Sequence, residues 1–212
     1  MTEQFKSPTR PFFRILFESL NLSLLGNFTF IMILLVNIFY SFSGYLPCTF
    51  FATYVEKREW NKDLANILMI VFALGSVFGR LFFSNLTQFT KINPIHVFIV
   101  VGVSWVMVYI GFAFCTTIYL CFVLQALHAI FLSPYVVMTS ILCVEYLGIE
   151  SLTNAMGFLS LGRGIFSLLS GPIAGFIVEK TDEYVVLYLT AGSIPIGFII
   201  ISSLALLMKR KL

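Results

Sequence analysis

The stretch from Ile92 to Val144 contains no Asp, Glu, Lys or Arg side chain, and most of its residues are apolar. A helix needs about 20 residues to cross the hydrocarbon core of a bilayer, which is ~30 Å thick. The stretch is therefore too long for one crossing and has to fold back once. This feature predicts two membrane-spanning helices joined by a tight turn at Cys115–Ile118.

The composition of the whole chain points in the same direction. Hydrophobic residues make up 59% of the 212 residues, charged residues make up 11%, and 24 residues are Phe. Ordinary soluble domains carry about 25% charged residues, and a soluble domain of this size leaves much of its surface in water. We therefore exclude a soluble enzyme, a nucleic-acid-binding protein and a disordered chain, and we expect a polytopic membrane protein.

Uncharged apolar stretches divide the chain into six expected membrane-spanning helices, so the fold class is all-α. They are Asn27–Val55, Leu64–Leu86, Pro94–Phe114, Tyr119–Val144, Ser151–Val178 and Tyr184–Met208. The expected organisation is an N-terminal segment over 1–26, a six-helix transmembrane domain over 27–208 and a basic C-terminus over 209–212. Apolar residues recur at helical spacing from Phe13 to Leu24, which predicts an amphipathic interfacial helix or an extension of the first span.

Positive charge is unevenly distributed between the two sides of this topology. Seven Lys or Arg residues lie on the side of the two termini, and four lie on the other side among six acidic residues. Because positively charged loops stay in the cytosol, we expect both termini to be cytosolic. The expected location is the plasma membrane.

The motifs of common enzymes and metal sites are missing from the sequence. The two Asp residues, Asp63 and Asp182, fall in expected loops, and the sequence contains no GxSxG or HExxH motif. His96 and His128 are isolated, whereas metal sites need clustered ligands. We therefore expect no enzymatic activity, no metal and no cofactor.

The four cysteines, at positions 48, 115, 121 and 143, form no CxxC pair. Free cysteines usually pack as small apolar side chains, and we favour that interpretation here. Cys115 and Cys121 could approach each other at one membrane face, but a sequence cannot establish a disulfide.

Two arginines lie inside expected spans, where an unpaired charge is costly and usually faces a cavity or a partner. Arg80 is close enough to the end of its span to reach the headgroups by snorkelling. However, Ser76, Arg80 and Ser84 share one helical stripe with Ala73, which suits a transport pathway or a tight helix contact. Both interpretations stay open.

Arg163 lies about twelve residues into the fifth span, or ~18 Å from its edge. That depth is too great for easy snorkelling, and Ser160, Ser167 and Ser170 share its helical face. We expect a water-filled cavity or a buried ion partner around Arg163. The chain has no acidic residue at matching depth, so an anionic ligand would suit this guanidinium.

Other polar and small residues in the spans carry weaker signals. Gln125 and His128 share a face of the fourth span, where we interpret them first as interhelical hydrogen-bonding groups and second as pathway residues. Small residues spaced four apart predict close helix contacts in the second and fifth spans. These residues are Gly75 and Gly79, and Ser167, Gly171 and Gly175. Pro134 and Pro172 are candidate kinks that leave backbone carbonyls in need of partners.

The order of several segments resembles the monocarboxylate transporter family of the major facilitator superfamily. Ala155–Gly192 is similar to the eleventh helix, the following loop and the start of the twelfth helix of that family. Phe42–Val55 resembles the seventh helix, and Gly75–Leu86 resembles the eighth. The likeness covers nearly the whole chain, but only the C-terminal half of a twelve-helix transporter.

This resemblance implies a three-plus-three inverted repeat and assigns Arg80 to the position of the arginine that binds the substrate carboxylate. The family often has an aspartate four residues earlier, which supports proton symport. Here that residue is Ser76, which puts proton coupling through this helix in doubt. The candidate substrate-binding residues are Arg80, Arg163, Ser76, Ser84, Ser167, Gln125 and His128.

The resemblance therefore predicts a solute carrier, or half of one, for small organic anions such as monocarboxylates, with protons as a candidate co-substrate. We expect it to pair with another six-helix unit in the lipid bilayer and to bind no nucleic acid. The alternative is a membrane protein that does not transport but pairs with a full-length carrier or another partner and regulates it.

Overall fold

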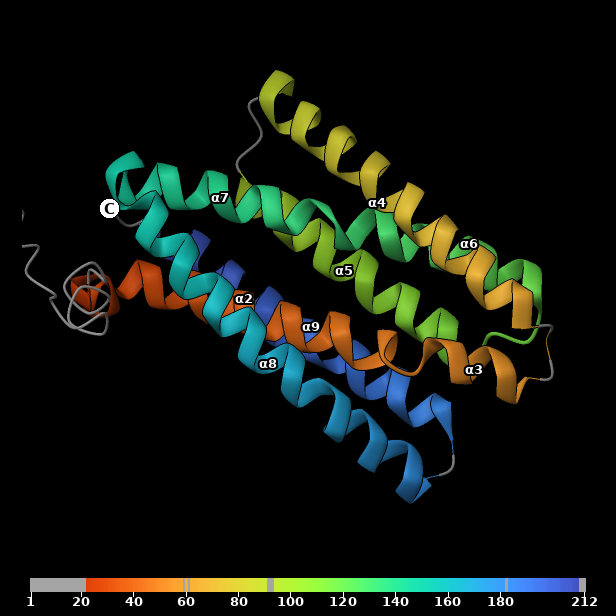
Figure 1. Ribbon diagram of the computed structural model, residues 1–212. Helices are drawn as coiled ribbons and strands as arrows, with labels where there is room; N and C mark the ends of the chain where they lie inside the picture. Colours follow the sequence, from red (N-terminus) through yellow and green to blue (C-terminus); the bar gives the residue numbers. More distant parts are fainter. Residues whose placement is uncertain (1–21, 59, 61, 91–93, 182, 210–212) are drawn as a thin grey trace, which may run out of the picture.

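The computed structural model of the protein describes residues 22–58, 60, 62–90, 94–181 and 183–209. The described residues form helices joined by short links, as an all-α membrane protein requires, and Figure 1 shows their arrangement. The helices are η1 (Leu22–Gly26), α2 (Phe28–Cys48), α3 (Phe51–Lys57), α4 (Lys62–Thr90), α5 (Pro94–Ala113), α6 (Ile118–Leu132), α7 (Pro134–Leu147), η2 (Ile149–Ser151), α8 (Leu152–Thr181) and α9 (Tyr184–Lys209). Most of the segment expected to form an interfacial helix lies outside the described residues.

Five helical runs of the described chain are long and apolar enough to cross a membrane. The first run joins α2 to α3, and the fourth joins α6 to α7. The last helix, α9, has a shorter apolar run at Tyr184–Gly197 within the part searched. The protein is thus a multi-pass membrane protein, as the uncharged stretches predicted.

Local sequence signals explain where several helices begin and end. The Asn27 side-chain oxygen accepts hydrogen bonds from the backbone N–H groups of Thr29 at 2.9 Å and Phe30 at 3.4 Å. This cap satisfies donors that the first turn of α2 would leave free. At the same end of the bundle (Figure 1), Gly148 ends α7 with a φ of 81°, which favours glycine.

Two of the expected single spans are broken helices. The first breaks at Thr49–Phe50, just after Pro47, and the fourth breaks at Ser133, just before Pro134. Each proline lacks an N–H and so leaves a carbonyl one turn earlier without its helical donor. The kink expected at Pro134 is confirmed, whereas Pro172 lies inside the single helix α8.

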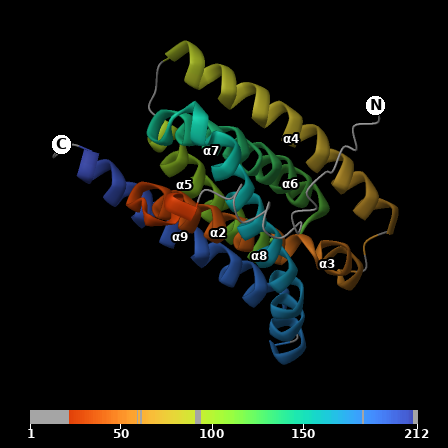
Figure 2. The same ribbon diagram turned by 60° about the vertical axis from the view of Figure 1, so that its left-hand side comes forward.

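The packing of the helices has the exchange pattern of an inverted repeat. α4, the second span, packs on α6 of the fourth, and α8, the fifth span, packs on α2 of the first. α5 packs on α9, which are the third and sixth spans. Exchanging the first three spans with the last three reproduces this pattern. Figures 1 and 2 show α4 and α8 on opposite sides of the bundle.

The buried core is rich in aromatic side chains from the central helices. Trp105 and Tyr109 of α5, Tyr135 of α7 and Tyr188 of α9 are almost completely buried. By contrast, α4 and α8 expose many large apolar side chains, such as Leu74 and Leu168. Such exposed faces suit lipid or a second apolar unit rather than water.

Candidate functional site

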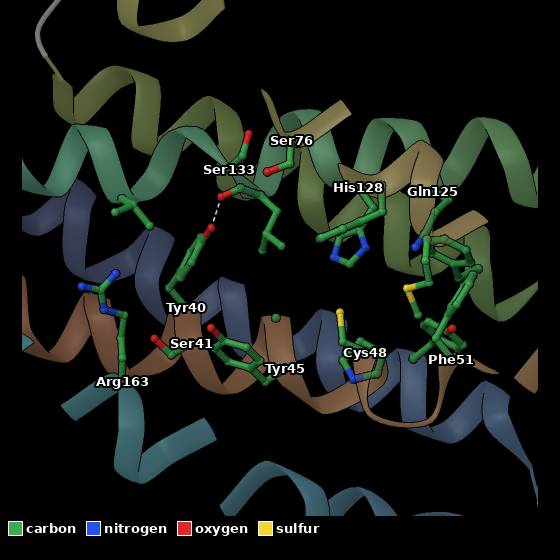
Figure 3. Close-up of a pocket in the computed structure, with 18 of the residues that line it drawn as sticks. Tyr40, Ser41, Tyr45, Cys48, Phe51, Ser76, Gln125, His128, Ser133 and Arg163 are labelled. Carbon is green, nitrogen blue, oxygen red and sulfur yellow. Dashed lines mark hydrogen bonds between the residues drawn. The ribbon is translucent and has the colours of Figure 1, made fainter. Parts of the chain in front are cut away.

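A cavity of about 430 Å³ opens between the helices, and residues from all six spans line it. Its polar lining includes five of the seven residues that the sequence nominated, and Figure 3 shows most of them. These five are Arg80, Arg163, Ser76, Gln125 and His128. Arg163 lies toward one end of the cavity, and Gln125 lies toward the other (Figure 3).

Arg80 is held at the cavity by the close packing of α4 on α6. A Cβ atom added at the neighbouring Gly79 would lie 2.6 Å from the Ser133 hydroxyl oxygen, and one added at Gly75 would lie 2.9 Å from the Ala129 Cβ. Only glycine allows this approach. Because Ser76 lies one helical turn before Arg80 and also lines the cavity, both side chains face the same space.

Arg163 reaches the same cavity from α8 on the opposite side of the bundle. Its side chain is half-buried, and its Nη2 donates a hydrogen bond to the Ser160 hydroxyl at 3.1 Å. That serine is three residues earlier on the same helical face, so α8 itself orients the guanidinium. Part of the donor capacity of Arg163 remains available for a ligand.

Among the described residues that line the cavity, two are cationic and none is acidic. Within the described part of the chain, neither Arg80 nor Arg163 forms an ion pair. Guanidinium groups in an apolar medium are stable only when an anion, water or other acceptor compensates them. The arrangement therefore suits an anion, which a guanidinium can bind through two parallel hydrogen bonds.

His128 is fixed by a chain of hydrogen bonds behind the cavity wall. The Tyr109 hydroxyl donates to the Ser43 carbonyl at 3.0 Å and lies 3.2 Å from His128 Nε2. Since the hydroxyl proton is used at Ser43, Nε2 has to carry the proton that joins it to Tyr109. His128 is thus an interhelical hydrogen-bonding group, as the sequence suggested, and also a cavity residue.

The same Ser43 connects two carbonyls that prolines leave without helical donors. Pro47 releases the Ser43 carbonyl, which Tyr109 pairs, and Pro195 of α9 releases the Ala191 carbonyl. The Ser43 hydroxyl donates to that second carbonyl at 2.7 Å. These bonds tie α2, α5 and α9 together directly behind the cavity.

Gln125 contributes a buried amide to the cavity. Only 2% of its surface is exposed, and its Oε1 has no hydrogen-bond partner in the structure. A buried amide oxygen without a partner costs about 1–3 kcal/mol. The Oε1 atom of Gln125 is therefore available for a ligand or water in the cavity.

A sequence model of the Major Facilitator Superfamily matches residues 22–211. The chain belongs to the Major Facilitator Superfamily. It is also similar to Monocarboxylate transporter 10 of Danio rerio, with 25% identity over 157 residues. The match covers 72% of this chain and 30% of the relative, so the chain spans about a third of that protein's length. This similarity supports the monocarboxylate transporter-like assignment made from the sequence.

Two nominated residues of this superfamily member do not line the cavity. Ser84 and Ser167 are half-buried on α4 and α8 but are not among its lining residues. The Ser167 hydroxyl donates to the Gly164 carbonyl at 2.9 Å, within its own helix. A shared helical stripe therefore predicted their direction only approximately, because each helix passes the cavity over a limited length.

Sequence reasoning missed several aromatic residues that line the cavity, including Tyr40, Tyr45 and Tyr188. Tyr40 stacks on Tyr135 with ring centroids 3.4 Å apart, and its hydroxyl donates to the Leu132 carbonyl beside the break between α6 and α7. The available signal was the run of hydroxyl-bearing residues from Tyr40 to Tyr45 within an apolar span. In a superfamily member, such a run can indicate a wetted face of the helix.

Proposed function

We propose that the chain transports small organic anions of the monocarboxylate type and binds the carboxylate group in the cavity that Arg80 and Arg163 line. The observation that carries this proposal is that two arginines without described ion pairs share one cavity, and that none of the described residues lining it is acidic. A water-poor cavity strengthens the attraction between a guanidinium and a carboxylate. Superfamily membership supports a transporter rather than an enzyme.

The proposal includes a second six-helix unit that faces the cavity. Arg80 is exposed on this unit, and α4 and α8 present long apolar faces beside it. A charge facing lipid costs several kcal/mol or deforms the bilayer. A second unit, of this chain or another, removes that cost by closing the cavity.

Proton coupling is the finer part of the proposal, and the residue at position 76 argues against a proton site on α4. The side chain there is a serine, which does not ionise in the physiological range. We infer that any proton movement accompanying the anion uses a different group. Transport through this site then depends on the anion gradient rather than on protonation beside Arg80.

Uptake of a radiolabelled monocarboxylate into liposomes that contain only the purified chain tests the transport proposal. We expect uptake above that of protein-free liposomes, and we expect Arg80→Leu to abolish it. The competing regulatory function predicts no uptake by the chain alone, together with a changed rate when a full-length carrier is reconstituted beside it. That second pattern would overturn the transport proposal.

The proposed topology has both termini in the cytosol of cells and the protein in the plasma membrane. Epitope tags before Thr2 and after Leu212 should bind antibody only after permeabilisation. Staining of either tag on intact cells would overturn this orientation. The tags also report the location of the protein by microscopy.

A further inference from the structure

The turn between α5 and α6 brings two cysteines together at one end of the bundle. Cys115 follows the end of α5, and Cys121 lies in the first turn of α6. Both side chains are fully buried, while Thr116 and Thr117 between them are exposed. The thiols therefore lie just beneath a surface turn rather than in the middle of the membrane.

One carbonyl group holds both cysteines. The Cys115 Sγ donates to the Thr117 carbonyl at 3.4 Å, and the Cys121 backbone N–H donates to the same carbonyl at 3.1 Å. Cys115 and Cys121 therefore meet at one carbonyl of the turn, and a disulfide between them requires their sulfur atoms to come within ~2.05 Å of each other.

An aromatic wall of the cavity lies at the same end of α5 as the cysteine pair. The Tyr54 hydroxyl of α3 donates to the Phe112 carbonyl at 3.4 Å, near the end of α5. Tyr54 also packs on Tyr188 with ring centroids 5.2 Å apart, and both Phe112 and Tyr188 line the cavity. A covalent link at the turn would therefore fix the end of α5 that supports this wall.

The other two cysteines lie elsewhere in the fold. Cys48 is on α2 and lines the cavity, and Cys143 is buried on α7. Both lie outside the turn that joins α5 to α6. Cys143, which does not line the cavity, therefore provides a matched control for the pair.

We propose that Cys115 and Cys121 form a reversible intramolecular disulfide by exchange with a small disulfide such as oxidised glutathione. One cysteine thiolate attacks a sulfur of the oxidant, breaks its S–S bond and releases one reduced thiol. The second cysteine thiolate then attacks the protein sulfur of the mixed disulfide and releases the other. Two protein thiols are oxidised, the oxidant is reduced to two thiols, and the two cysteine protons pass to the released thiolates.

The proposed membrane orientation gives this pair a suitable redox environment. With both termini in the cytosol, the α5–α6 turn faces the opposite side of the membrane. Disulfides persist in extracellular and lumenal compartments and are rare in the reducing cytosol. The disulfide itself does not depend on transport, so its test is separate from the uptake assay.

Chymotryptic mapping of the purified full-length chain tests the proposal. The enzyme cleaves after Phe114, Tyr119, Leu120 and Phe122, so residues 115–119 and 121–122 separate unless a disulfide joins them. After incubation with oxidised glutathione, we expect the joined fragment by mass spectrometry and its separation on reduction. Maleimide labelling of the denatured chain should fall from four thiols to two.

Variants make the result specific to the pair. Cys115→Ser and Cys121→Ala should each lose the joined fragment, and Cys143→Ser should retain it. The proposal is overturned if the unmodified chain keeps four reactive thiols under oxidation, or forms only glutathione adducts. It is equally overturned if Cys115 or Cys121 pairs with Cys48 or Cys143.

Discussion

α4 and α8 occupy equivalent places in the two repeats, yet they pack in different ways. Each helix carries one arginine, a row of small residues and a broad apolar face, and each packs against the first span of the other repeat. On α4, a Cβ atom at Gly79 would come within 2.6 Å of the Ser133 hydroxyl. On α8, one at Gly175 would lie 3.5 Å from the nearest atom, in the Phe50 ring.

The partner helix explains this difference. α6 presents Ala126, Ala129 and Ser133 to the glycines of α4, so two rows of small residues meet and the backbones approach closely. α8 instead faces Thr49 and Phe50 at the break of the first span, and these side chains keep the helices apart. A row of small residues on one helix permits close contact only when the facing residues of the other helix are also small.

The two arginines give the largest expected contrast between α4 and α8. Arg80→Leu should reduce uptake by about 30-fold or more, because a hydrogen bond to a charged group contributes about 1.5–3 kcal/mol and Arg80 has no described ion partner. Arg163→Leu should reduce uptake less, about tenfold, because Ser160 already satisfies part of its guanidinium. Liposome uptake of a labelled monocarboxylate measures both.

The lysine variant of Arg80 shows whether geometry or charge is responsible for the effect. Arg80→Lys keeps the charge but loses the planar pair of donors, so most of the activity should be lost. Wild-type uptake by Arg80→Leu would remove Arg80 from the site and leave Arg163 as the carboxylate-binding residue.

The packing contrast predicts that α4 tolerates a methyl group poorly. Gly79→Ala places a Cβ atom against the Ser133 hydroxyl and the Ile130 carbonyl of α6. Overpacking of this kind costs about 1–3 kcal/mol. The melting temperature of the detergent-solubilised chain should fall, and an unchanged value would show that α4 and α6 are less tightly packed than described.

A carboxylate one turn before Arg80 should make transport sensitive to protons. Ser76→Asp introduces a titratable group that faces the cavity beside Arg80, so an inward proton gradient should increase uptake several-fold. Ser76→Asn, which matches the aspartate in shape but does not ionise, is the control. The equivalent position on α8, Leu159, is fully buried, so α8 offers no comparable site.

The smallest effect is expected at Gly175. Its added Cβ would make ordinary van der Waals contact with Phe50, and alanine is the better helix former by up to about 1 kcal/mol. Gly175→Ala should therefore leave the melting temperature unchanged or raise it slightly. A large decrease would mean that α8 packs as tightly as α4, which would remove the contrast.

The spans could be predicted from the sequence because their apolar length is dictated by the membrane. The six expected crossings follow from long apolar stretches that carry at most one charge each, and α4 extends only a few residues beyond its expected limits. The break at Thr49–Phe50 could not be predicted from the sequence. Hydrophobicity indicates that a segment crosses the membrane, but not whether its helix is continuous. Whether Pro47 breaks the helix depends on a neighbour, Tyr109, that pairs the released carbonyl.

The residues of the candidate site also fall into those that the sequence indicated and those that it did not. Arg80, Arg163 and Gln125 attracted attention because polar groups in a membrane need a reason to be there. Phe51 and Tyr188 did not, since aromatic residues fill cores and line cavities with the same sequence pattern. Their role follows from tertiary packing, which a single sequence does not record.

The hydrogen bonds around Ser43 bear on how the protein is assembled in the membrane. Until α5 is inserted, the carbonyl that Pro47 releases on α2 lacks the Tyr109 donor, whereas the carbonyl that Pro195 releases on α9 finds its donor on α2, which precedes α9 in the chain. Neither α2 nor α9 satisfies all of its backbone carbonyls in the bilayer by itself. We therefore expect α2 to remain beside the translocation machinery until α5, which supplies the missing donor, has followed it.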